Sequence, residues 1–242
     1  MQKFAVLSDI HANLEAFEAV WRDIAALGIR DVFSLGDNIG YGPDPEAVIQ
    51  RLTALAIPSV LGNHELAVND PSELDWFNPI ARESLRKTVA MLSAASIEFI
   101  HQLPYCRVWE AYRFVHGFPP DSPVIYQFQV SSEDLETTFH ELPEQVFFTG
   151  HTHFPEIIAF QNGRIARDEL DEGLRPLDPE ARYIINVGSV GQPRDGNNNA
   201  KYVVFDPEHY ALELRYIPYD VETVVHKILA AGLPESHATR LR

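Results

Sequence analysis

Five short segments of the sequence place aspartate, asparagine or histidine directly after an apolar run. They cover residues 7–11, 35–38, 61–65, 115–117 and 149–153. Ligands of α/β proteins gather at the carboxyl ends of strands, where the side chains of neighbouring strands meet. We therefore expect the polar residues of these segments to converge on one site.

The polar side chains suit a particular class of metal ion. They are two aspartates, one asparagine and four histidines: Asp9, His11, Asp37, Asn63, His116, His151 and His153. Oxygen and nitrogen donors without a thiolate suit Mn²⁺, Fe²⁺ or Zn²⁺ better than a soft metal or a dedicated Ca²⁺ cage. Asp-x-His or Gly-Asp-Asn alone is common in ordinary turns. The five segments together predict a metal site.

The first part of the chain alternates short apolar runs with helical periodicity, which indicates an α/β fold. Residues 4–7, 31–35 and 58–61 are predicted strands, and apolar residues at three- and four-residue spacing predict a helix over 14–27. Residues 67–104 have a helical pattern and could form a cap over the site.

The second part of the chain is richer in strands. The predicted strands are 105–109, 112–115, 146–148, 157–160, 165–170, 183–187, 202–205 and 212–216. Helices are predicted at 132–141 and 221–230, and the tail at 236–242 is expected to fray.

The composition is that of an acidic chain with one cysteine. Of 242 residues, 35 are acidic and 19 are basic, which gives a formal net charge of −16. This charge repels phosphate backbones and disfavours nucleic acid as a partner. Cys106 is the single cysteine, so no disulfide can form within the chain. No apolar run approaches the length of about 20 residues that spans a membrane, so we expect a cytoplasmic protein.

The order of the motifs resembles that of the calcineurin-like metallophosphoesterases. The motifs are Asp-x-His, Gly-Asp-Asn, Gly-Asn-His-Glu, His-Gly and Gly-His-Thr-His. Residues 8–15, 36–45 and 186–196 look like the small bacterial and archaeal branch that is often labelled phosphodiesterase or diadenosine-tetraphosphatase-related. The resemblance covers roughly residues 3–216. It implies a four-layer α-β-β-α sandwich, with two mixed β-sheets flanked by helices, and we expect one domain over residues 1–242.

The resemblance also implies which residues hold two divalent metal ions. One ion would be held by Asp9, His11, Asp37 and His153. The other would be held by Asp37, Asn63, His116 and His151, so that Asp37 bridges the two. Mn²⁺ is the favoured metal, and Fe, Zn or Ni are left open.

A reaction follows from the same resemblance. A hydroxide held between the two metals would attack phosphorus, with Asp37 and His64 as the catalytic residues and His64 protonating the leaving oxygen. Glu65 stands where many members have aspartate, and its carboxylate could orient His64. Asn13 and Arg194 would contact the phosphate.

Several functions fit this resemblance. The main hypothesis is a phosphodiesterase or phosphatase that acts on small or nucleotide phosphoesters, with selectivity set by residues 67–104, 118–127 and 192–199. A specific dinucleoside polyphosphate hydrolase is one alternative. A non-catalytic scaffold is another, since the superfamily includes a retromer coat subunit that binds partners. A DNA-repair nuclease would need a basic track. Preference for monoester or diester, and formation of a homo-oligomer, are left open.

Overall fold

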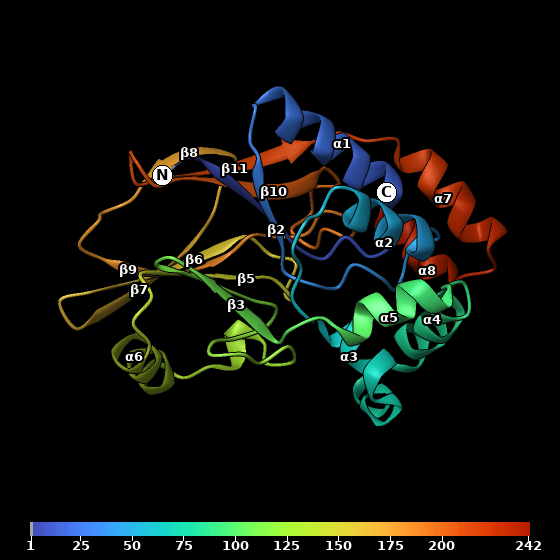
Figure 1. Ribbon diagram of the computed structural model, residues 1–242, viewed down its shortest axis with the longest axis horizontal. Coiled ribbons are helices and arrows are strands. Elements are labelled where there is room, and N and C mark those ends of the chain that lie inside the picture. Colours follow the sequence, from blue (N-terminus) through green and yellow to red (C-terminus); the bar gives the residue numbers. More distant parts are fainter. Residues whose placement is uncertain (1) are drawn as a thin grey trace.

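The computed structural model describes residues 2–242 and contains two β-sheets that pack face to face (Figure 1). The strands of the first sheet are, in order across it, β2 (Asp31–Ser34), β1 (Phe4–Leu7), β10 (Ala200–Asp206), β11 (Ala211–Ile217) and β8 (Gly173–Pro176). Those of the second sheet are β3 (Cys106–Trp109), β4 (Tyr112–Val115), β5 (Val146–Thr149), β9 (Arg182–Asn186), β6 (Glu156–Gln161) and β7 (Arg164–Glu169). Both sheets are mixed, because β1 and β2 pair in parallel, as do β4, β5 and β9, while the other neighbours pair antiparallel.

Helices lie between and after these strands. They are α1 (Leu14–Ala26), α2 (Pro45–Ala54), α3 (Asn63–Asn69), α4 (Pro79–Val89), α5 (Ala94–His101), α6 (Ser132–Glu141), α7 (Val221–Ala230) and α8 (Glu235–Arg240). Short 3-10 segments cover Pro71–Trp76 and Gln127–Gln129. None of the helices within residues 2–242 combines the length and the hydrophobicity that crossing a membrane requires.

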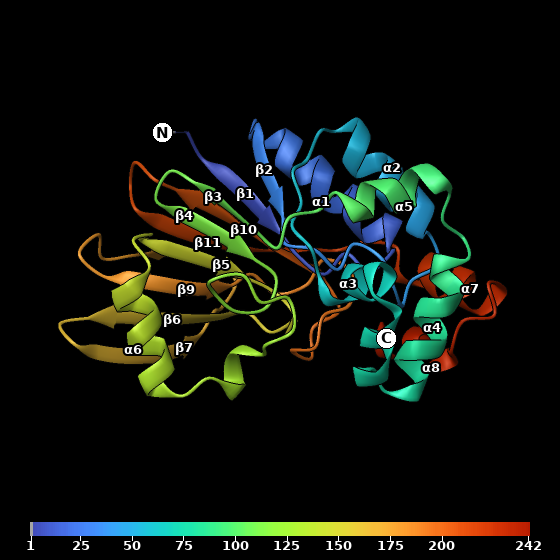
Figure 2. The same ribbon diagram turned by 60° about the horizontal axis from the view of Figure 1, so that its bottom comes forward.

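The two faces of each sheet bury their side chains in different layers. In β1, Phe4 and Val6 pack between the sheets, whereas Ala5 and Leu7 pack on the side covered by helices. This alternation follows from the period of two along a strand. Strand β5 alternates in the same way, and its Phe147 packs in the layer that includes α6. Helices α1 and α7 lie outside the first sheet and α6 lies outside the second (Figures 1 and 2), which confirms the predicted four-layer sandwich.

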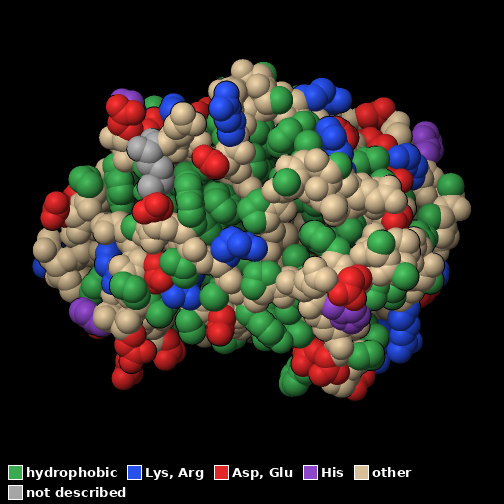
Figure 3. All heavy atoms as spheres, in the orientation of Figure 1, with side chains coloured by type: hydrophobic (Ala, Val, Ile, Leu, Met, Phe, Trp, Pro, Cys, Tyr) green, Lys and Arg blue, Asp and Glu red, His purple; other side chains and the backbone are tan. Residues whose placement is uncertain are grey.

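Charged side chains cover the outer surface of this sandwich. On the face shown in Figure 3, Asp and Glu side chains are spread widely, with Lys and Arg side chains between them.

Two expectations about the elements were wrong. Residues 58–61 form no strand but a single bridge between Ser59 and Ser34, since Pro58 has no N–H to extend the ladder. The tail does not fray: α8 forms, and His237 and Leu241 are buried, with Leu241 packing against α7. Strand β8 was not predicted, because a four-residue edge strand carries little sequence pattern.

Candidate metal centre

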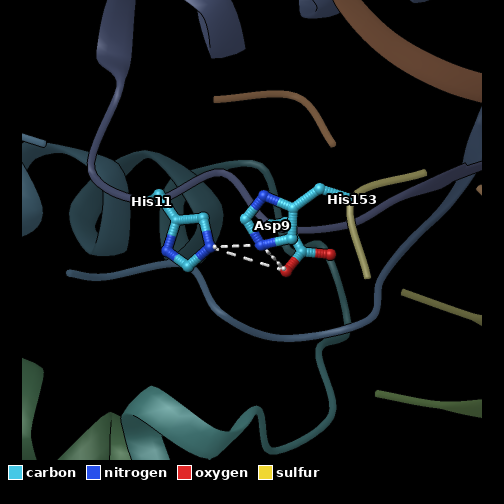
Figure 4. Close-up of side chains that lie close together, drawn as sticks. All are labelled: Asp9, His11 and His153. Atoms are coloured by element: carbon cyan, nitrogen blue, oxygen red, sulfur yellow. Dashed lines mark hydrogen bonds and ion pairs between the residues drawn. The ribbon is translucent and has the colours of Figure 1, made fainter. Parts of the chain in front are cut away.

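The first group of candidate metal ligands comes from the loops after β1 and β5. Asp9, His11 and His153 point their polar atoms at one another (Figure 4). The Nε2 atoms of His11 and His153 are 3.1 Å apart, and the Oδ1 atom of Asp9 is 3.5 Å from the first and 3.1 Å from the second. These loops belong to different sheets, so the face-to-face packing of the sandwich assembles the group.

A second group lies on the other side of Asp37. The Nε2 atom of His116, which follows β4, is 3.2 Å from Nδ1 of His151 and 3.2 Å from Oδ1 of Asn63. The Oδ2 atom of Asp37 is 3.3 Å from Nε2 of His116 and 3.7 Å from Nε2 of His11. The Asp37 carboxylate thus lies between the two groups.

The four histidines of these groups are each fixed by a hydrogen bond from the ring nitrogen that faces away. The acceptors are backbone carbonyls: Ile39 for His11, Leu35 for His116, Val124 for His151 and Gln192 for His153. A histidine that donates one N–H to a carbonyl keeps a lone pair on its other nitrogen, as metal-binding histidines do. The other ring nitrogen of each of the four histidines therefore faces an aspartate carboxylate or a neighbouring histidine of its group.

The two aspartates are held as carboxylates. Asp9 accepts hydrogen bonds on Oδ2 from the Ser8 hydroxyl at 2.6 Å and from the backbone N–H of His151 at 3.0 Å. Its buried Oδ1 atom accepts none from the described residues. Burial alone would raise the pKa of Asp9, but the neighbouring histidines hold it well below its usual range. Burial alone would lower the pKa of His116. The nearby Asp37 carboxylate has the opposite effect and raises this pKa to about 9.

The side chains of this cluster are suited to hold a metal ion. Buried carboxylates facing buried imidazoles, with an unpaired carboxylate oxygen between them, would be costly without a compensating cation. Asp9, His11, Asp37, Asn63, His116, His151 and His153, which the sequence predicted as ligands, all take part in the cluster. Asn63 is the first residue of α3 rather than part of a loop, so its side chain reaches the cluster from a helix N-terminus.

His64 lies beside the cluster but differs from its members. Its Nε2 atom is 3.9 Å from Oδ2 of Asp37, and its Nδ1 atom has no hydrogen-bond partner within residues 2–242. The ring packs edge-on against Tyr41 and Phe77, with centroids 4.7 and 4.9 Å away. Gly40 permits this position, since a Cβ there would lie 2.0 Å from Nδ1 of His64. His64 is therefore a buried histidine beside the cluster that no hydrogen bond from its ring fixes within the described residues.

Glu65 does not orient His64, which corrects the expectation from the sequence. Its carboxylate accepts backbone N–H groups of the loop after β2: Asp37 at 2.8 Å, Asn38 at 2.7 Å and Ile39 at 3.3 Å. It also accepts the N–H of Gly62 at 3.1 Å. Glu65 thus holds the loop that carries Asp37.

We expect Glu65→Ala to lower the free energy of unfolding by about 3 kcal/mol, because several buried backbone N–H groups lose their shared acceptor. Urea denaturation measures this change, with Glu98→Ala as the control, since Glu98 is exposed and accepts a hydrogen bond from the Gln102 side chain. A loss below about 1 kcal/mol would show that other groups hold the loop.

Asn13 and Arg194, the two residues expected to contact the phosphate, lie in different surroundings. Asn13 caps α1 through Oδ1, which accepts the N–H of Ala16 at 3.1 Å, and its Nδ2 donates to the Gly191 carbonyl at 3.0 Å. Both polar atoms of its side chain serve the fold. Arg194 is exposed, and its guanidinium lies beside the hydroxyls of Tyr41 and Tyr126 at the edge of the cluster.

A cleft opens over the second group. It has a volume of about 160 Å³ and is lined by Tyr41, Asn63, Glu73, Trp76, Phe77, Asn78, Ala81, Val124, Tyr126 and His151. Tyr126 stacks on His151 with ring centroids 3.8 Å apart, and Trp76 is 85% exposed at the rim. The predicted rim segments 67–104 and 118–127 therefore do border the site.

Comparison with known proteins places this fold and cluster in a family. The calcineurin-like phosphoesterase superfamily domain matches residues 2–209. An uncharacterised protein of Methanocaldococcus jannaschii, MJ0912, is 35% identical in an alignment of 242 positions that covers 98% of this chain and 96% of that protein. The chain belongs to the calcineurin-like phosphoesterase superfamily, as the order of motifs predicted.

Solved structures agree with this assignment. The crystal structure of a metallophosphoesterase from Sphaerobacter thermophilus has a TM-score of 0.83 and 34% identity, with 99% of this chain and 98% of that chain covered. The hypothetical protein PH1004 of Pyrococcus horikoshii has a TM-score of 0.80 and 19% identity, with coverage of 100% and 98%. The second likeness shows the fold alone.

Proposed function

We propose that the chain is a two-metal hydrolase of phosphate esters that acts on small or nucleotide substrates. The observation that carries this proposal is the position of the Asp37 carboxylate between two groups of inward-facing histidines. One ion would be held by Asp9, His11, Asp37 and His153, and the other by Asp37, Asn63, His116 and His151. Mn²⁺ is the favoured ion, because imidazole with carboxylate suits a borderline metal.

Bound divalent cations would polarise the phosphate oxygens and supply hydroxide at neutral pH. The protein's side chains would hold these ions and protonate the leaving oxygen. We assign the second task to His64, because its Nε2 atom lies 3.9 Å from Oδ2 of Asp37 and its ring packs against Phe77, which lines the cleft. Burial lowers the pKa of His64 to about 3 in the chain alone, whereas an anionic phosphate beside it would favour the protonated ring.

The cleft sets the size of substrate. Its volume of about 160 Å³ is below the range of about 300–1,000 Å³ typical of drug-sized ligands, which supports a small substrate. Tyr41, Phe77 and Tyr126 offer apolar surface for an organic group or a base. The intact donor set supports an enzyme over the scaffold alternative.

Chromogenic substrates test the proposal. We expect the chelator-treated chain to hydrolyse neither p-nitrophenyl phosphate nor bis-p-nitrophenyl phosphate, and Mn²⁺ to restore turnover of at least one, because the ions supply both polarisation and nucleophile. Preference for the diester would identify a phosphodiesterase. Metal binding without turnover of either substrate would contradict a general phosphoesterase and favour a scaffold.

A further inference from the structure

A second cavity adjoins the cleft on the side of the C-terminal helix. It has a volume of about 260 Å³ and is lined by Tyr41, Asn78, Ile80, Ala81, Gln192, Arg194, Ser236, His237 and Arg240. It shares Tyr41, Asn78 and Ala81 with the cleft over the metal centre. A molecule bound at the centre could therefore extend into it.

This cavity is cationic in an otherwise acidic protein. Arg194 and Arg240 both line it, and neither forms an ion pair with a carboxylate within residues 2–242. Two of the acids near these arginines are paired with lysines: Asp195 with Lys201 at 2.9 Å, and Glu83 with Lys87 at 2.8 Å. Two guanidinium groups without acids, together with the amides of Asn78 and Gln192, form an environment for an anion.

His237 supplies a buried polar atom without a partner. Its side chain is among the buried polar groups at 6% exposure, and Nε2 has no hydrogen-bond partner within residues 2–242. The ring lies 4.9 Å from Tyr41, whose ring in turn lies 4.5 Å from His11 and 4.7 Å from His64. Tyr41 is thus the wall between the metal centre and His237.

The elements that carry these residues are firmly attached. Leu233, Ala238 and Leu241 pack against α7, and Lys87 donates to the Gly232 carbonyl at 2.5 Å. On the other side, the buried Lys201 ammonium donates to the carbonyls of residues 197 and 199 at 2.6 and 3.0 Å, which holds the loop of Arg194. The cavity is a built part of the fold.

We propose that this cavity binds a second phosphate group of the substrate, held by Arg194, Arg240 and His237 beside the scissile phosphate. The proposal rests on the proposed function, and it narrows the substrates to phosphoesters that carry a further phosphate a short distance away. Phosphate fits better than an apolar group, because planar guanidinium groups bind its oxygens in pairs.

The first test compares two chromogenic diesters with the Mn²⁺-loaded full chain. They are p-nitrophenyl thymidine 5′-phosphate and its 3′-phosphorylated counterpart, which share the leaving group and differ by one phosphate. We expect kcat/KM to favour the 3′-phosphorylated ester by about tenfold, the effect of one charge-assisted contact. Arg240→Gln should abolish this preference. Arg242→Gln should keep it, since Arg242 belongs to the same tail but pairs with Glu222 at 2.6 Å.

A second test is independent of turnover. Calorimetric titration of the chelator-treated full chain with inorganic tripolyphosphate should show binding that weakens about tenfold in Arg240→Gln and is unchanged in Arg242→Gln. Absence of hydrolysis with this binding pattern would overturn the proposed function while supporting the anion site. Equal binding by wild type and Arg240→Gln, or a preference that survives this substitution, would overturn the second-phosphate site.

Discussion

Replacing Asp37 by asparagine is expected to lower kcat/KM by about 10³-fold, because a metal ion supplies several kcal/mol of transition-state stabilisation. The Oδ2 atom of Asp37 lies 3.7 Å from Nε2 of His11 and 3.3 Å from Nε2 of His116, and its Oδ1 atom accepts the backbone N–H of His64 at 2.9 Å. An asparagine has a single oxygen and no charge, so it cannot serve both groups and the backbone. The metal content should fall from two ions per chain toward one at limiting Mn²⁺.

The matched control for this loss is Asp168→Asn. Asp168 is an exposed acid on β7 that pairs with Arg175 at 2.7 Å. The Asp168→Asn substitution removes one negative charge, as Asp37→Asn does, but at a position far from the cluster. Turnover and metal content should therefore stay at the wild-type values. Wild-type turnover by Asp37→Asn would refute the bridging role of Asp37.

The second large effect is expected from His64→Ala, which should lower kcat by about 10²- to 10⁴-fold, the range for loss of a general acid. The four histidines that bond backbone carbonyls are unaffected by this change, so both metal ions should still bind. The loss should be smallest for p-nitrophenolate and should grow with the pKa of the leaving alcohol, since a poor leaving group needs the proton more.

His226→Ala provides the comparison, because His226 is an exposed histidine on α7. Stopped-flow or steady-state assays with a series of aryl and alkyl phosphates measure the dependence on the leaving group. An equal loss across that series would show that His64 positions the phosphate rather than protonating the leaving oxygen. Full turnover with both metals bound would exclude any role for it in the reaction.

The residues that form the cluster could be predicted from the sequence because their signal is local. Asp9, Asp37, His116 and His151 each follow a short buried strand, and strand ends of an α/β fold carry the site. What the sequence did not show is that the loops come from two different sheets. That contact depends on Phe4, packed between the sheets, and on its partners across the interface.

Other features could not be predicted because tertiary contacts determine them. Glu65 is one residue from His64 in sequence, yet its carboxylate bonds the loop after β2, and no spacing rule reports this. Helix α8 has six residues, too few to be stable alone, and it forms because Ala238 and Leu241 pack on α7. For that reason, the sequence did not predict that His237 and Arg240 lie in the cavity that adjoins the cleft.

Anomalous diffraction from crystals of the Mn²⁺-loaded protein tests the central claim most directly. The proposal predicts two peaks, one on each side of the Asp37 carboxylate: the first among Asp9, His11 and His153, and the second among Asn63, His116 and His151. A single peak at full loading, or a metal held elsewhere with these side chains unchanged, would contradict the two-metal centre.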